Sequence, residues 1–172
     1  KRGLKSEGRY RESIRQQLER DKLRESFAAT APKSGPAAHV LRLSTSTRDE
    51  GLVARIQLLQ FDYPFEEVVA QATDRPNNAG KSGDLGWVAE GSQGREFDDV
   101  VFSSETPLNQ WTEPFAVGNH YEMVMVLDRD DNRPYDQGNI QAIGDRAFDD
   151  WLADQKASPD IQRDLSAQER QW

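Results

Sequence analysis

One run in the second half of the chain constrains the fold more than any other stretch. Residues 120–127 read His-Tyr-Glu-Met-Val-Met-Val-Leu, in which Glu122 is the one acidic side chain. Successive side chains of a strand point to opposite faces, so this run is apolar on both faces except at Glu122. Such a pattern is typical of a central strand that is covered on two sides. The sequence therefore predicts a sheet with this run near its centre.

The rest of the chain reads as helices that separate short strands, which predicts the α+β class. Apolar side chains at helical spacing mark the helices, and short runs of strand-forming residues mark the strands. We expect strands at residues 37–43 and 110–115, helices at 48–59, 65–72 and 96–102, and loops or turns at 28–36, 73–81, 103–109 and 128–134.

Two outer segments, residues 9–27 and 139–155, read as amphipathic helices. In the first, Tyr10, Ile14 and Leu18 recur at every fourth residue and form an apolar stripe. An isolated helix of this length is marginal in water, so each stripe needs a partner. We expect the two helices to pack together. The chain then divides into an N-terminal helix with its linker (1–36), a central domain (37–130) and a C-terminal helical segment (131–172).

Composition excludes several kinds of protein. The formal net charge of the 172 residues is −8, and residues 1–32 hold nine basic and five acidic residues, so the remainder carries −12. An acidic body argues against nucleic acid as a ligand. The sequence has no cysteine, which excludes disulfides and thiolate metal sites. It also has no run of about 20 apolar residues that would cross a membrane.

A glycine-rich stretch, Ser82-Gly83-Asp84-Leu85-Gly86-Trp87, carries the strongest functional signal. By itself it indicates a turn that leads into a strand, because glycine permits positive φ and Asp can bond nearby backbone N–H groups. In an extended chain Leu85 and Trp87 would point to the same side.

With its flanks, this stretch resembles the Gly-Gly-Asp-Leu-Gly core of the parvulin family of peptidyl-prolyl isomerases, and the resemblance runs from about residue 37 to 126. Ala38-His39-Val40-Leu41 matches the first strand of the family, and Gly118-Asn119-His120 matches the opening of the last strand. The resemblance implies a parvulin-like domain in which His39 and His120 are catalytic and their rings lie close together. It also implies flanking helical segments like those of bacterial extracytoplasmic foldases and chaperones.

The family resemblance also implies a cup for the proline ring. Leu85 matches its first residue, and Phe97, followed by two aspartates, matches its third, with Phe102 as the aromatic residue that follows. The middle position falls on Gln93, which is polar, and Trp87 lies directly beyond the turn. We expect these five side chains to contact substrate. Rotation about a peptide bond needs an apolar pocket and fixed hydrogen bonds but no nucleophile or metal, so we expect no cofactor.

One position departs from the family, which places Asp or Cys in the loop before the turn. The spacing assigns that position to Arg75, whereas a slip of one residue would assign it to Asp74. The loop between Pro114 and Gly118 is also about two residues shorter than in the family. Both departures put the efficiency of catalysis in question more than the fold.

Two functions follow from the resemblance. The first is an isomerase of weak activity on X-Pro bonds of unfolded or secreted polypeptides, and the second is a parvulin-like module that holds extended peptides with little turnover. Both imply proline-containing polypeptides as partners, without nucleic acid or metal. Both also imply an extracytoplasmic location, periplasmic or at the cell surface, although the sequence shows no signal or anchor. Any membrane tether would require segments outside this sequence.

Overall fold

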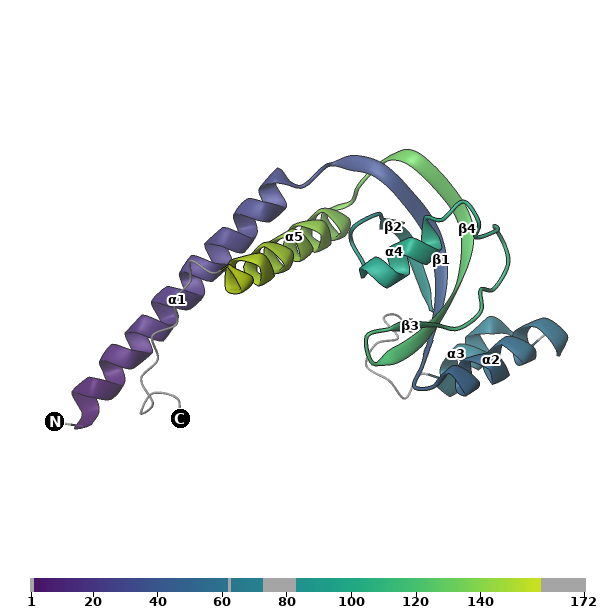
Figure 1. The fold of residues 1–172 in the computed structure, drawn as a ribbon, viewed down its shortest axis with the longest axis horizontal. Coiled ribbons are helices and arrows are strands. Elements are labelled where there is room, and N and C mark those ends of the chain that lie inside the picture. Colours follow the sequence, from purple (N-terminus) through teal and green to yellow (C-terminus); the bar gives the residue numbers. More distant parts are fainter. Residues whose placement is uncertain (1, 62, 73–82, 159–172) are drawn as a thin grey trace. The chain divides into compact units, whose positions relative to one another are not determined.

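A computed structural model describes residues 2–61, 63–72 and 83–158 of the chain (Figure 1). Its contacts divide the chain into two compact units. One unit is Pro32–Ile143, and the other combines Lys1–Ala31 with Gly144–Trp172. The two units are described separately below.

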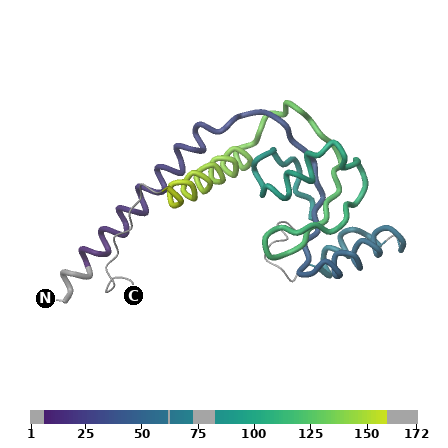
Figure 2. Tube along the Cα trace, viewed as in Figure 1, coloured from purple at the N-terminus to yellow at the C-terminus, as the bar shows by residue number. Residues whose placement is uncertain are grey.

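The first unit contains a four-stranded antiparallel sheet with strand order β2-β1-β4-β3. Its strands are β1 (Ser34–Thr45), β2 (Asp84–Ala89), β3 (Phe115–Val117) and β4 (His120–Pro134). The two longest strands, β1 and β4, pair along nearly their whole length and run side by side in Figure 2. The predicted α+β class and the inner position of the run that begins at His120 are confirmed.

Each face of this sheet buries its own apolar cluster. On one face, α4 (Arg95–Val101) packs its Phe97 and Val101 against β1, β2 and β4, and this face is called the α4 face below. On the other face, α2 (Arg48–Gln60) and α3 (Phe65–Ala72) cover a second cluster around Leu43 and Met123. Both faces of β4 are therefore buried near its middle, which is the physical reason for its doubly apolar sequence.

Two predicted irregular segments are part of the sheet or of a helix instead. Residues 128–134 continue β4, because Ser34, Gly35 and the residues that follow them in β1 pair with this segment up to Pro134. Of residues 28–36, the first three end α1 and the last three begin β1, and only residues 31–33 lie between the two elements. Local turn preference predicted loops at both places, but pairing between distant strands overrides such preferences. The last short strand, β3, also begins later than the predicted 110–115.

A bulge in β2 changes the direction of the side chains in the glycine-rich stretch. On β1 the pairing moves two residues, from His39 to Leu41, while on β2 it moves three, from Trp87 to Asp84. Gly86 has a φ of 65°, a conformation that favours glycine at an extra residue of this kind. Leu85 consequently packs into the cluster of the α4 face, while Trp87 lies beside His39 on the other face. The expectation that Leu85 and Trp87 point the same way is wrong for this reason.

The second unit pairs the C-terminal part of α1 (Arg2–Thr30) with residues 144–157 of α5 (Gln137–Ala157). The ring of Phe27 lies 5.8 Å from that of Phe148 and 5.9 Å from that of Trp151. Gly144 lies so close to Ala28 that a Cβ there would come within 2.4 Å of its backbone. The predicted packing of the two outer helices is confirmed at this end, whereas Tyr10 and Leu18 of α1 are exposed.

Candidate functional site

The α4 face carries an apolar zone built from five elements. Leu85 comes from β2, and Phe97 and Phe102 come from α4 and the residue that ends it. All three pack with Phe115 of β3 around the valines of β1 and β4. Phe97 is 1% exposed, while the other three aromatic and aliphatic side chains are half-buried. Side chains far apart in the sequence therefore meet in one apolar zone on the α4 face.

Polar side chains occupy the continuation of the same face toward the start of β4. Glu122 lies two residues before Val124, and Ser44 is its direct partner across the strands. Three donors converge on one oxygen of this carboxylate, Oε1. They are Nη1 of Arg42 at 3.4 Å, Oγ of Ser44 at 3.5 Å and Nε2 of His120 at 3.0 Å. We call Arg42, Ser44, His120 and Glu122 the buried ionic cluster.

Burial sets the energetics of this cluster. The side chains of Glu122, Arg42 and His120 are 3%, 11% and 17% exposed. A charge that leaves water at such a site is costly unless it is paired and hydrogen-bonded. Two atoms of the cluster nevertheless have no hydrogen-bond partner in the described part of the chain, namely Oε2 of Glu122 and Nδ1 of His120.

The glycine-rich stretch lies between the apolar zone and the buried ionic cluster. The carbonyl oxygen of Gly83 accepts a 2.7 Å hydrogen bond from the backbone N–H of Arg42. Gly83 has a φ of 68°, and a Cβ there would lie 2.7 Å from both the Arg42 carbonyl oxygen and the Phe65 ring. Only glycine fits this crossing without displacement of its neighbours. The close crossing brings Leu85, two residues later, to the boundary between the apolar zone and the buried ionic cluster.

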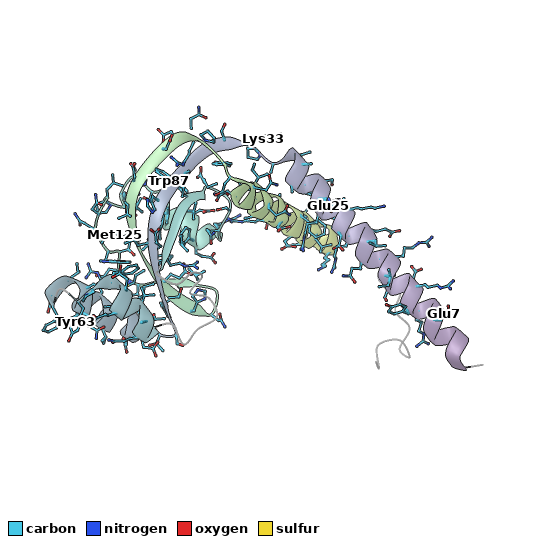
Figure 3. The ribbon with its side chains drawn as sticks, turned by 180° about the vertical axis from the view of Figure 1, so that it is seen from behind. Glu7, Glu25, Lys33, Tyr63, Trp87 and Met125 are labelled. Carbon is cyan, nitrogen blue, oxygen red and sulfur yellow. The ribbon has the colours of Figure 1, made fainter. Side chains whose placement is uncertain are left out.

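A second group of polar side chains lies on the opposite face, nearer the middle of β1. His39 Nε2 lies 2.9 Å from Oδ1 of Asp84, and the His39 ring lies 5.9 Å from the ring of Trp87. The guanidinium of Arg133 stacks 3.8 Å from the centre of the Trp87 ring. Trp87 is labelled in Figure 3. We call His39, Asp84, Trp87 and Arg133 the exposed polar cluster.

The pKa of Asp84, the carboxylate of this cluster, is lowered from its ordinary value. Partial burial raises the pKa of Asp84, but the hydrogen bonds from the Gly86 N–H and from His39, together with the charge of His39, outweigh it and lower the pKa overall. The carboxylate is 42% exposed, so solvent screens these interactions.

The structure separates the two histidines that the resemblance placed together. His39 pairs with Asp128 across β1 and β4, and His120 begins β4 eight residues earlier. At about 3.3 Å per residue this places them on the order of 25 Å apart along the strand. They also belong to opposite faces, because His39 alternates with Ala38 and Val40 of the α4 face. The expectation of adjacent rings is therefore wrong for this chain.

The other predicted site residues fall into three groups. Leu85, Phe97 and Phe102 meet on the α4 face, and Trp87 lies on the opposite face. Gln93 is half-buried in the bend that precedes α4. Asp74 and Arg75 lie outside the described residues, as does the whole predicted loop 73–81 that contains them.

Three members of the buried ionic cluster, Arg42, Ser44 and Glu122, were not among the predicted site residues. Glu122 gave a usable signal, because a single acid in a run that is apolar on both faces must find partners when the strand is buried. Arg42 gave a weaker signal of the same kind, since it interrupts the apolar residues of β1.

Among the described residues, no set of three or more His, Cys, Asp or Glu side chains is arranged to hold a metal ion. None of the helices in the same residues has the length and apolar character needed to span a membrane.

Comparison with known proteins identifies what this arrangement is similar to. Residues 42–128 match the family model of the PPIC-type PPIase domain, named Rotamase. The foldase protein PrsA of Geobacillus sp. (strain WCH70) is 26% identical over 102 residues, which are 59% of this chain and 34% of that protein. This chain thus spans about a third of the length of that relative.

Solved structures show the same fold at lower sequence identity. PrsA of Bacillus anthracis superposes with a TM-score of 0.54 at 17% identity, over 83% of this chain and 72% of that one. PrsA of Bacillus cereus gives 0.51 at 17% identity, over 91% and 66%. A structure described with two SurA-like chaperones of Campylobacter jejuni, a virulence factor and a periplasmic protein, gives 0.50 at 12% identity, over 94% and 74%.

Proposed function

This chain belongs to the PPIC-type PPIase (parvulin) family, and on that premise we propose that it is a peptidyl-prolyl cis–trans isomerase that assists the folding of other polypeptides. Its substrates are the X-Pro bonds of unfolded or secreted chains. The observation that carries the proposal is the convergence of Leu85, Phe97 and Phe102 on one face of the sheet, beside a cluster of hydrogen-bonding groups.

The chemistry of prolyl isomerisation fits such a face. Rotation about a peptide bond meets a barrier of about 18–20 kcal/mol, because the twisted amide loses its resonance. An apolar surface holds the proline ring and removes water, and fixed polar groups can then favour the twisted state over the planar one. Leu85 and Phe102 are half-buried and supply such a surface, while Arg42 and His120 lie on the same face.

The individual roles taken from the family are parts of the same proposal. His39 and His120 contribute to catalysis, Gln93 and Trp87 contact the peptide, and either Asp74 or Arg75 stands at the acid position of the family. Separate substitution of each residue tests these roles. For the acid position, we expect Arg75→Asp to raise turnover and Asp74→Ala to leave it nearly unchanged. The opposite result would assign the position to Asp74.

A second function, a peptide-holding chaperone with little turnover, is favoured by one specific observation. Phe97, the third residue of the proposed cup, is 1% exposed because the chain's own residues already cover it. The middle position, Gln93, is polar and a weaker contact for a proline ring. Such a face would grip extended peptides without closing around the proline.

Two-dimensional exchange NMR of a proline peptide, with and without the protein, separates the two functions. The parent protein should accelerate cis–trans exchange, and Leu85→Ser should abolish most of the acceleration. Leu59→Ser is the matched control, because Leu59 is 53% exposed on α2 and outside the α4 face. Peptide binding without faster exchange would favour the chaperone function, and neither binding nor exchange would refute both.

The partners and location follow the same proposal. We expect proline-containing, unfolded or extended polypeptides as clients and an extracytoplasmic location. Support for the location comes from the chaperone structures of similar fold, whose description includes a periplasmic protein. Fractionation of the native host, with detection of the endogenous protein, tests this expectation.

A further inference from the structure

The buried ionic cluster places a charged side chain, Glu122, at a position where an apolar side chain would also fit the fold. Position 122 directly precedes the buried apolar residues Met123 and Val124 of β4. A buried charge can often be replaced by an apolar side chain of similar volume without loss of stability. Glu122 is instead a carboxylate that is 3% exposed and receives three donors on a single oxygen. Retention of a charge at such a position calls for a role beyond packing.

The contact between Glu122 and His120 defines the protonation pattern of the ring. An ionised carboxylate accepts hydrogen bonds and donates none. The 3.0 Å contact from His120 Nε2 to Glu122 Oε1 therefore requires the hydrogen on Nε2. In the neutral ring this leaves Nδ1 as the acceptor, and this atom is buried without a partner in the described part of the chain. A carboxylate that holds a histidine in one tautomer fixes both the orientation of the ring and the nitrogen that carries the hydrogen.

The cluster adjoins the residues proposed to hold the proline. Phe115, which packs in the apolar zone, is the direct partner of Glu122 across β3 and β4. Val124, two residues beyond Glu122 on the same face, belongs to the cluster that contains Phe97. Arg42 carries the backbone N–H that fixes the crossing of Gly83, just before Leu85.

We propose that Glu122 is the positioning residue of the isomerase site, an inference that rests on the function proposed above. Glu122 acts through its neighbours and does not touch substrate. It holds His120 in the Nε2–H tautomer and holds the Arg42 guanidinium in place, so that the dipoles and charge beside the proline cup are fixed before substrate binds. Preorganised groups of this kind favour the twisted state because they need no rearrangement during the reaction. The acid of this site thus lies on β4.

The test compares Glu122→Gln with the double variant Arg42→Gln/Glu122→Gln. The single variant keeps the shape of the side chain but removes the negative charge that Glu122 places beside Arg42, whereas the double variant removes both charges. Glu113→Gln is the matched control, because Glu113 also pairs with arginines, Arg48 and Arg55, but is 58% exposed and lies outside the site. Each variant is measured for stability by urea unfolding and for kcat and KM by exchange NMR at several peptide concentrations.

A spectroscopic measurement accompanies the kinetics. Nitrogen-15 shifts of the His120 ring, recorded at about pH 8.5, well above the ordinary histidine pKa of about 6.5, report the tautomer directly. We expect the Nε2–H form in the parent protein and a mixture in Glu122→Gln, because an amide can either accept from or donate to the ring.

The positioning role predicts that kcat falls about tenfold in Glu122→Gln while KM stays within about twofold, since the interaction matters mainly in the transition state. The double variant should recover stability but keep the low kcat. Parental kcat in Glu122→Gln, or recovery of kcat together with stability in the double variant, would overturn this inference alone. The same holds for an Nδ1–H tautomer in the parent. A folded parent protein that catalyses no exchange would instead overturn the isomerase function, and the positioning role with it.

Discussion

Two histidine–carboxylate pairs occupy opposite faces of the same sheet, and they differ chiefly in burial. His39 and Asp84 are 30% and 42% exposed, and an aromatic ring and a guanidinium lie beside them. His120 and Glu122 are 17% and 3% exposed. Arg42 and Ser44 also contact the Glu122 carboxylate. The contact distances, 2.9 Å and 3.0 Å, are almost the same.

The difference shows that the contact distance alone does not determine how much such a pair contributes to stability. Exposed ion pairs contribute little, because water and salt screen the attraction and the side chains lose freedom. In a buried pair the removal of one partner leaves a charge without compensation, which is costly. We therefore expect substitutions in the buried ionic cluster to affect both stability and activity, and substitutions in the exposed polar cluster to have small effects.

The largest expected effect is on stability. Glu122→Ala removes the carboxylate that Arg42, Ser44 and His120 all contact, and should lower the free energy of unfolding by about 3–5 kcal/mol. Asp84→Ala, the equivalent change at the exposed pair, should cost about 1 kcal/mol or less. Urea unfolding of both variants with a common m-value measures the two losses. Equal losses would contradict the comparison.

The next effect concerns activity. Because His120 lies on the face of Leu85 and Phe97 while His39 lies on the other, His120→Ala should reduce catalysed prolyl exchange about tenfold, or ~1.4 kcal/mol in the barrier. His39→Ala should reduce it less than about threefold when peptide binding and folding are intact. Exchange NMR at equal protein and peptide concentrations decides between them. A larger loss in His39→Ala would place catalysis at the exposed polar cluster.

A smaller effect is expected in acid. The pKa of Asp84 is lowered from its ordinary value of 3.8, so the folded state releases this proton more readily than the unfolded state does. The resulting stabilisation is present above pH 3.8 and is lost as the pH falls through the lowered pKa of the folded protein. The stability difference between the parent protein and Asp84→Asn should therefore shrink between about pH 6 and pH 2.5. A difference that grows toward low pH would reverse the assigned direction.

The smallest expected effect is that of phosphate before the proline. Arg42 is paired with Glu122, and Arg48, the basic residue that begins α2, lies 3.7 Å from Glu113 beside Asp49 and Glu50. Neither guanidinium forms an anion clamp of the kind that several unopposed basic residues make. Matched peptides with and without phosphoserine should bind alike in a fluorescence titration. A tenfold gain from phosphate, ~1.4 kcal/mol, would contradict this expectation.

Much of the fold was predictable because the signals are local. Residues 65–72 have apolar side chains at helical spacing, and α3 occupies Phe65–Ala72. The doubly apolar run that begins at His120 predicted an inner strand, and β4 lies between β1 and β3. The segment 128–134 was not predictable in this way. Its Asp and Asn residues favour turns locally, but its partner is the start of β1, about a hundred residues away in the chain.

The candidate site likewise has features that local sequence predicts and features that depend on the pairing of distant strands. The resemblance to a family motif predicted from the sequence that Leu85, Phe97 and Phe102 line one apolar site, and the three side chains do pack in one cluster. The sequence also showed that Glu122 is the one acidic side chain in a run that is otherwise apolar on both faces. Neither inference depends on which strands are neighbours.

Only the tertiary structure decided which of these residues share a face. A strand's side chains alternate with a period of two, so one extra residue moves everything beyond it to the other face. The bulge at Gly86 separates Leu85 from Trp87, and the register of β1 with β4 separates His39 from His120. Register depends on hydrogen bonds between distant segments, and for this reason no motif within a single segment could report it.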